Sequence, residues 1–227
     1  MLKNQFILLI LIFCTLEIHA QEGYTTRQIT DMVGQMNWDR NVLQGNSNIA
    51  GTPYLKEEFK NGNVFYDGKY KVTQVPLRLN LYNDQFEFKD KNTVMAFADP
   101  RHIDKIVIEN EIYIYIDKSM GAEVFGFVKK WNAKLPTVLT KMKIEFLNKE
   151  DPKPFEDTKP ERFERAMDKH YIMKSKNEIV KVTSVKKLIK YLGTHTEELS
   201  IFAKEEKISA GDPEELAKLL EYYHELE

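Results

Sequence analysis

Apolar and polar residues alternate with a period of two along residues 63–147, which is typical of β-strands. The stretches with this pattern are NVFYDGKYKV, VPLRLNLYNDQFEFK, TVMAFAD, KIVIENEIYIYID, EVFGFVKKW and LTKMKIEFL, starting at residues 63, 75, 93, 105, 123 and 139. Asp67-Gly68 and the segment from Glu109 to Glu111 lie between such runs and predict tight turns. Because short links join antiparallel neighbours, this region is expected to form an antiparallel β-meander, as a curved sheet or half-barrel.

The pattern changes to a period of about 3.6 residues after residue 182, which predicts α-helices. Three short amphipathic helices are expected within residues 184–193, 194–206 and 211–226. Ser184, Thr194 and Asp212 are the expected N-caps, and Gly193 is the expected end of the first helix. Residues 170–182, HYIMKSKNEIVKV, predict a further hairpin that returns to the main sheet. The fold class is therefore α+β, with a meander followed by three short C-terminal helices.

The same patterns suggest a division of the chain. Residues 1–20 are a signal peptide, and residues 21–62 form an N-terminal segment with many turn residues. Residues 63–147 form the antiparallel sheet domain. Residues 148–161, NKEDPKPFEDTKPE, combine proline with charge and are expected to be a linker loop, and residues 162–227 carry the hairpin and the helical region.

The N-terminus has the layout of a secretory signal peptide. Lys3 precedes the apolar run FILLILIFC, and the small residue Ala20 comes before Gln21. The run is short for a hydrocarbon core of about 30 Å, and Glu17 follows it closely, although an uncleaved anchor stays open as the alternative. We expect cleavage after Ala20, export to the periplasm or outer envelope of a Gram-negative bacterium, and no membrane span after cleavage.

Composition narrows the possible functions. Cys14 is the single cysteine and belongs to the signal peptide, so the mature chain is expected to contain no disulfide, thiol nucleophile or cysteine-ligated zinc. The chain has 33 lysines and arginines against 35 acidic residues, a net charge of −2. Nucleic-acid binding requires a basic face that neutralises phosphates, so this class of partner is not expected.

The stretch VPLRLNLYNDQFEFK raises the first candidate site. A two-residue turn at Asn83-Asp84 would place its leucines and phenylalanines on one side of the sheet and its polar residues on the other. In the simpler interpretation, this polar row is the solvent-exposed side of a hairpin, and its exposed cross-strand ion pair contributes ~0–1 kcal/mol to stability. The alternative is a ligand-binding site on a concave face. The residues concerned are Arg78, Asn80, Tyr82 and Glu87.

Some strands are apolar on both faces, which predicts that both faces are covered. The cover could be the C-terminal helices and the N-terminal segment. Alternatively, one face could line an apolar cavity that holds a lipid or another apolar ligand. The residues that would line such a cavity are Tyr113, Tyr115, Phe125 and Phe127.

Motifs for catalysis are weak in this sequence. It contains no Gly-x-Ser-x-Gly motif, no phosphate-binding glycine-rich loop and no His-Glu-x-x-His motif. His102 and Asp104 could share one side of a strand, but two ligands are a weak signal for a metal. We therefore predict no catalytic residue, metal site or cofactor, and retain a carboxylate-based hydrolase as an alternative.

Several stretches together resemble an uncharacterised group of secreted proteins from Bacteroidota. They are GTPYLKEEF, VPLRLNLYNDQFEF, DKHYIMKSKNEIVKV and IFAKEEKIS with DPEELAKLLEYYHEL. Arg78 and Asn80 match the pattern of that group, whereas Leu79 stands where the pattern has an aromatic residue. The resemblance implies an envelope location and no assigned activity.

The expected function is a non-enzymatic secreted envelope protein with a binding or structural role and an envelope protein as its partner. A periplasmic carrier of an apolar small molecule and a hydrolase remain as alternatives.

Overall fold

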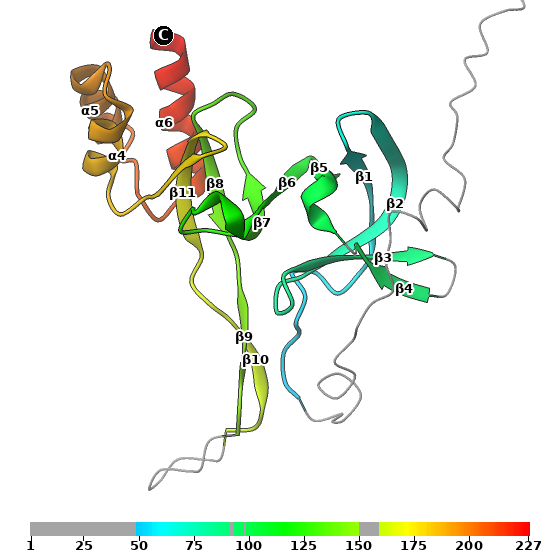
Figure 1. The fold of residues 1–227 in the computed structure, drawn as a ribbon. Coiled ribbons are helices and arrows are strands. Elements are labelled where there is room, and N and C mark those ends of the chain that lie inside the picture. The colour runs from blue at the N-terminus through cyan, green and yellow to red at the C-terminus, as the bar shows by residue number, and fades with distance from the viewer. Residues whose placement is uncertain (1–48, 91–92, 98, 150–158) are drawn as a thin grey trace, which may run out of the picture.

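The computed structural model describes residues 49–90, 93–97, 99–149 and 159–227 (Figure 1). The expected signal peptide and residues 21–48 of the N-terminal segment lie outside the described residues, as do residues 150–158 of the linker. The strands are β1 (Lys60–Tyr66), β2 (Tyr70–Asn80), β3 (Gln85–Asp90), β4 (Thr93–Ala96), β5 (Ile103–Ile108), β6 (Glu111–Ile116), β7 (Gly126–Lys130), β8 (Thr137–Lys141), β9 (Ile144–Leu147), β10 (Arg162–Arg165), β11 (Lys169–Ser175) and β12 (Glu178–Lys181). The helices are η1 (Pro100–His102), η2 (Lys118–Met120), α4 (Val185–Leu192), α5 (Thr196–Glu205) and α6 (Pro213–Leu226).

Ten strands form one antiparallel sheet in the order β12-β11-β8-β7-β6-β5-β1-β2-β3-β4, so the predicted meander is confirmed. The hairpin β11–β12 returns to this sheet and pairs with β8. Residues 139–147 were expected to form one strand, which is wrong. The chain leaves the sheet after Lys141, and β9 pairs with β10 in a separate two-stranded ribbon that projects away from the main sheet in Figure 1.

The tight turns arise from residues that tolerate positive φ. Asp67 and Gly68 have φ values of 51° and 63° in the β1–β2 turn, and Glu109 and Asn110 have values of 48° and 71° between β5 and β6. Two consecutive positive φ values match the right-handed twist of the flanking strands. Both predicted hairpins are therefore confirmed.

The three C-terminal helices begin largely where the sequence predicts. The Ser184 side chain accepts a hydrogen bond from the Lys187 backbone, and Asp212 caps α6 in the same way. The cap predicted at Thr194 is wrong, because α5 begins after His195. The Thr194 hydroxyl instead donates to Tyr223 of α6 and to Glu227, which follows that helix. Tertiary contacts have replaced a local cap at this position.

Three apolar clusters stabilise the fold. The first cluster, called the barrel core, lies inside the curled part of the open sheet, between β1–β3 and β5–β7. The second, called the helix core, joins α4–α6 to Val138 of β8 and Ile172 of β11. The reverse-face core contains Val128 and Leu139, which lie on the opposite side of the sheet, beneath the loop at residues 117–125. Figure 1 shows the helices grouped at the end of the sheet near β8 and β11, with β1–β4 at the other end.

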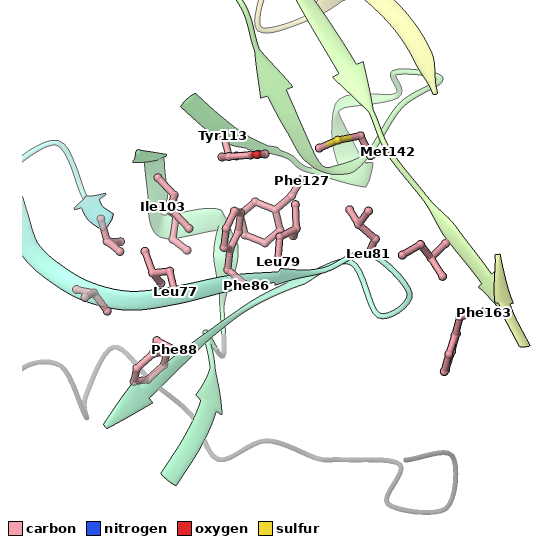
Figure 2. Packing of buried hydrophobic residues seen from close by; sticks show 14 residues of the cluster. Leu77, Leu79, Leu81, Phe86, Phe88, Ile103, Tyr113, Phe127, Met142 and Phe163 are labelled. Atoms are coloured by element: carbon pink, nitrogen blue, oxygen red, sulfur yellow. The ribbon is translucent and has the colours of Figure 1, made fainter. Parts of the chain in front are cut away.

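The sheet curls strongly at the end that holds the barrel core. Phe86 of β3 contacts Tyr113 of β6 and Phe127 of β7, with ring centroids 5.2 and 4.9 Å apart, although these strands are several positions apart in the sheet. Figure 2 shows Phe86, Phe127 and Tyr113 lying close together. The predicted curved sheet is present, and aromatic side chains fill the space that its curvature creates.

An ion pair joins the tip of the β2–β3 hairpin to β7 and β8. Asp84 Oδ1 lies 2.7 Å from Lys141 Nζ and also accepts a hydrogen bond from the Phe127 backbone. Gly126 has φ of 83°, and a Cβ there would overlap Asp84 Oδ2 and lie 2.8 Å from Lys141 Nζ. Gly126 is therefore required both by its backbone conformation and by the close approach of this hairpin.

Candidate functional site

The β2–β3 hairpin carries the first candidate site, and its turn differs from the predicted one. Strand pairing aligns Arg78 with Glu87 and Asn80 with Gln85, so the loop contains four residues, 81–84, rather than Asn83-Asp84 alone. The Asn80 side-chain oxygen accepts hydrogen bonds from the backbone N–H groups of Tyr82 and Asn83, at 3.1 and 3.0 Å. These two hydrogen bonds favour the four-residue loop over the two-residue turn at Asn83-Asp84. The longer loop changes which residues of β2 and β3 lie opposite each other.

The polar row on this hairpin is buried, so the prediction of an exposed row is wrong. Side-chain exposure is 16% for Arg78 and 1% for Glu87. Arg78 Nε donates to Glu87 Oε2 at 2.7 Å, and Asn80 Nδ2 donates to Glu87 Oε1 at 3.0 Å. Both carboxylate oxygens therefore have a donor, which compensates for the loss of water around a buried charge.

Residues 49–59 cover this polar row. The Arg78 guanidinium carbon lies 3.7 Å from the ring centroid of Tyr54 and 4.4 Å from that of Phe59, and Arg78 Nη2 donates to the Tyr54 hydroxyl. The Leu55 backbone donates to the carbonyl of Leu79. Burial raises the pKa of Tyr54, and Glu87 raises it further, while Arg78 opposes this effect. The site holds the segment against β2 and leaves Glu87 with no unpaired oxygen for a ligand.

Tyr82 is separate from the other three residues of this candidate site. The residue is 38% exposed, and its ring packs edge-on against Phe163 of β10, with ring centroids 5.4 Å apart. The structure thus brings Arg78, Asn80 and Glu87 together and places Tyr82 at the ribbon.

The second set of predicted residues is divided between the core and the surface. Tyr113 and Phe127 are buried in the barrel core, and Tyr115 packs against Phe127 with ring centroids 5.2 Å apart. Phe125 is 50% exposed, beside Lys118. The predicted two-sided burial of these strands is confirmed, because Val124 and Val128 lie in the reverse-face core. Phe127 contacts Tyr115 and Phe86, and Phe86 also contacts Tyr113.

A small recess opens beside the barrel core. Its cavity volume is about 30 Å³, which is room for about one water molecule. Glu111 lies on its wall and accepts hydrogen bonds from the Tyr113 hydroxyl at 2.6 Å and from Lys129 at 2.8 Å. Burial alone would raise the pKa of Glu111, but these two hydrogen bonds outweigh it and lower the pKa. The recess is too small for a lipid chain.

The histidines have structural partners. His102 Nδ1 lies 2.8 Å from Asp67, whereas Asp104 accepts a hydrogen bond from the Gly68 backbone. No cluster of three or more metal-ligating side chains occurs within the described ranges. His170 is buried and bridges Thr140 to the carbonyl of Gly211.

An open groove beside the edge strand β12 is a site that the sequence interpretation missed. Its cavity volume is about 580 Å³, and both polar and apolar residues line it. One wall is the chain after η2, and the other is β12 with its flanking residues. The lining residues are Met120, Gly121, Ala122, Glu123, Asn177, Ile179, Val180, Lys181 and Thr183. Local patterns predict each wall separately and carry no signal that the two walls lie side by side.

Exposed apolar surface accompanies this groove. Met120, which lines it, is 37% exposed, and Phe125 follows in the same connection between β6 and β7. Beneath this connection, Val124 and Ile179 lie in the reverse-face core and hold the two walls together. The groove therefore has a packed floor and an open top.

No known family model, curated protein or solved structure matches this chain. Among the helices that the structure describes, none combines the length and apolarity needed to cross a bilayer.

Proposed function

We propose that this protein is an exported, non-enzymatic binding protein that recognises a partner protein of the bacterial envelope through the groove beside β12. The observation that carries the proposal is the groove itself, which combines about 580 Å³ of open volume with a sheet edge and mixed polar and apolar walls. Edge strands present backbone donors and acceptors to a partner chain, so such a groove suits a protein segment.

The alternative functions have less support. A carrier of an apolar ligand requires a cavity of several hundred Å³ with largely apolar walls. The barrel core is instead filled by Phe86, Tyr113 and Phe127, and the recess beside it has a volume of about 30 Å³. A hydrolase requires a carboxylate that is free to act on substrate, whereas both oxygens of Glu87 are engaged by Arg78 and Asn80.

Site-specific photocrosslinking in the native host tests the binding function. A photoreactive amino acid replaces Met120 or Asn177 at the groove, and Ile201 on α5, which is 52% exposed, is the control position. We expect a discrete adduct of the full chain with one envelope protein from both groove positions and none from Ile201. Equal adducts at all three positions, or none at the groove, would contradict the proposal.

Cell fractionation tests the export. The charged start, apolar run and Ala20 support a mature chain that begins at Gln21. N-terminal sequencing of the envelope fraction should therefore start at Gln21. A chain that retains Met1 and stays in the cytoplasm would refute this part of the proposal.

A further inference from the structure

The region around β12 has a high positive charge, although the net charge of the whole chain is close to zero. Residues 169–190, which span β11, β12 and most of α4, contain seven lysines and one glutamate, a net charge of +6. Residues 194–227, which span α5 and α6, contain ten acidic residues and three lysines, a net charge of −7. The whole chain has a net charge of −2, so opposite charges are segregated along this part of it.

Most lysines of this basic region are exposed to solvent. Lys176, Lys181, Lys186, Lys187 and Lys190 are exposed, and none has an ion-pair partner among the described residues. Lys174 is engaged, because it donates to the carbonyl of Tyr191. Lys181 lines the groove together with one acidic residue, Glu123, and Lys176 precedes the lining residue Asn177. Exposed cations without partners at this end of the sheet favour an anionic ligand through electrostatic attraction.

The backbone of β12 has one free edge. In the described part of the chain, β12 pairs only with β11 and ends the sheet. The backbone N–H of Val182 donates to the carbonyl of His170 in β11. In an antiparallel pair, the N–H and C=O groups of successive residues point alternately toward and away from the partner strand. The N–H and C=O groups of Val180, two residues before Val182, therefore also point toward β11. Ile179 and Lys181, which both line the groove, therefore point their N–H and C=O groups away from β11, at the free edge of the sheet.

We propose, on the basis of the proposed binding function, that the partner inserts an acidic extended segment that pairs with β12 as an additional strand. The outward N–H and C=O groups of Ile179 and Lys181 bind its backbone. The exposed lysines of β12, its turn and α4 attract its carboxylates. Alternate side chains of the added strand lie toward Met120 and the groove floor, because successive side chains of a strand face opposite sides.

The first test uses synthetic peptides as probes for the full mature chain. A fluorescent decapeptide of alternating glutamate and valine is compared with one of alternating lysine and valine. We expect saturable binding of the acidic peptide only, weakening as salt rises from about 0.05 to about 0.3 M, because screening shortens the reach of the lysine charges. Equal binding of both peptides, or tight binding to anionic lipid vesicles instead of the acidic peptide, would overturn the inference.

The second test separates strand pairing from simple charge attraction. Lys181→Pro removes both the charge and an outward-pointing backbone N–H, whereas Lys181→Ala removes the charge alone. Proline is tolerated in an edge strand where the backbone N–H points away from the sheet, so Lys181→Pro is expected to fold. We expect Lys181→Pro to bind the acidic peptide about tenfold more weakly than Lys181→Ala. Lys204→Ala on α5 is the matched control and should bind like the unmodified protein. Equal affinities for Lys181→Pro and Lys181→Ala would refute strand addition.

A third measurement does not depend on the folding of a variant. Two further versions of the acidic peptide are compared, one with N-methyl groups on the backbone nitrogens of all glutamates and one with N-methyl groups on those of all valines. Because glutamate and valine alternate, each version loses the N–H donors along one of its two strand edges. Strand pairing predicts that one of the two loses binding, and parent-like affinity of both would refute it. If the photocrosslinks at Met120 and Asn177 persist while every acidic peptide fails, the binding function stands and the acidic strand is wrong.

Discussion

Replacing Arg78 with alanine tests whether the Arg78–Glu87 pair is a buried structural element. The substitution leaves the Glu87 carboxylate buried at 1% exposure, with the Asn80 amide as its remaining side-chain donor. Removing one partner of a buried ion pair costs about 3–5 kcal/mol of unfolding free energy. Because Arg78 retains 16% exposure, which admits some water, we expect about 3 kcal/mol, including the stacking lost against Tyr54 and Phe59.

Urea unfolding followed by circular dichroism measures this loss at constant pH and salt. Lys56→Ala is the matched control, because its ion pair with Glu109 leaves the two side chains 55% and 46% exposed, and it should cost ~0–1 kcal/mol. The double variant Arg78→Met with Glu87→Leu removes both charges at similar volume. It should be more stable than Arg78→Ala, since no charge remains unpaired.

The result that would refute this reasoning is a loss for Arg78→Ala no larger than that for Lys56→Ala. Such a result would mean that water reaches Glu87 readily in solution and that residues 49–59 do not seal the polar row. A double variant as unstable as Arg78→Ala would show instead that packing, and not the unpaired charge, dominates the cost.

Three further predictions concern other parts of the fold. Gly126→Ala should cost clearly more than about 1 kcal/mol in urea unfolding, and more than Gly121→Ala, because both glycines have positive φ but only Gly126 lacks space for a Cβ. Thr140→Val should cost about 1–3 kcal/mol in the same assay by breaking its buried contact with His170, and a neutral result would contradict this. Burial raises the pKa of Tyr113 above its ordinary value of 10.0, so the native state holds its proton longer than the unfolded state. Stability should therefore fall as pH rises above about 10, and Tyr113→Phe should flatten that fall in alkaline melting curves, whereas an unchanged slope would contradict the assignment.

Local patterns in the sequence determined much of the fold. Alternation placed Val124 and Val128 on one face and Phe127 on the other, and the two faces are indeed packed into different cores. Ser184, Gly193 and Asp212 marked helix ends correctly because caps depend on hydrogen bonds within a few residues. Such features need only near neighbours in the chain, so the residues themselves encode them.

The tertiary structure alone decided the burial of the polar row and the location of the groove. Arg78 and Glu87 follow the pattern of an exposed strand face, and they are buried because Tyr54 and Phe59 from a distant segment cover them. The groove forms where the chain after η2 lies beside β12, more than fifty residues later. The physical reason is that alternation shows which residues share a face, whereas burial depends on which segment comes to lie over that face.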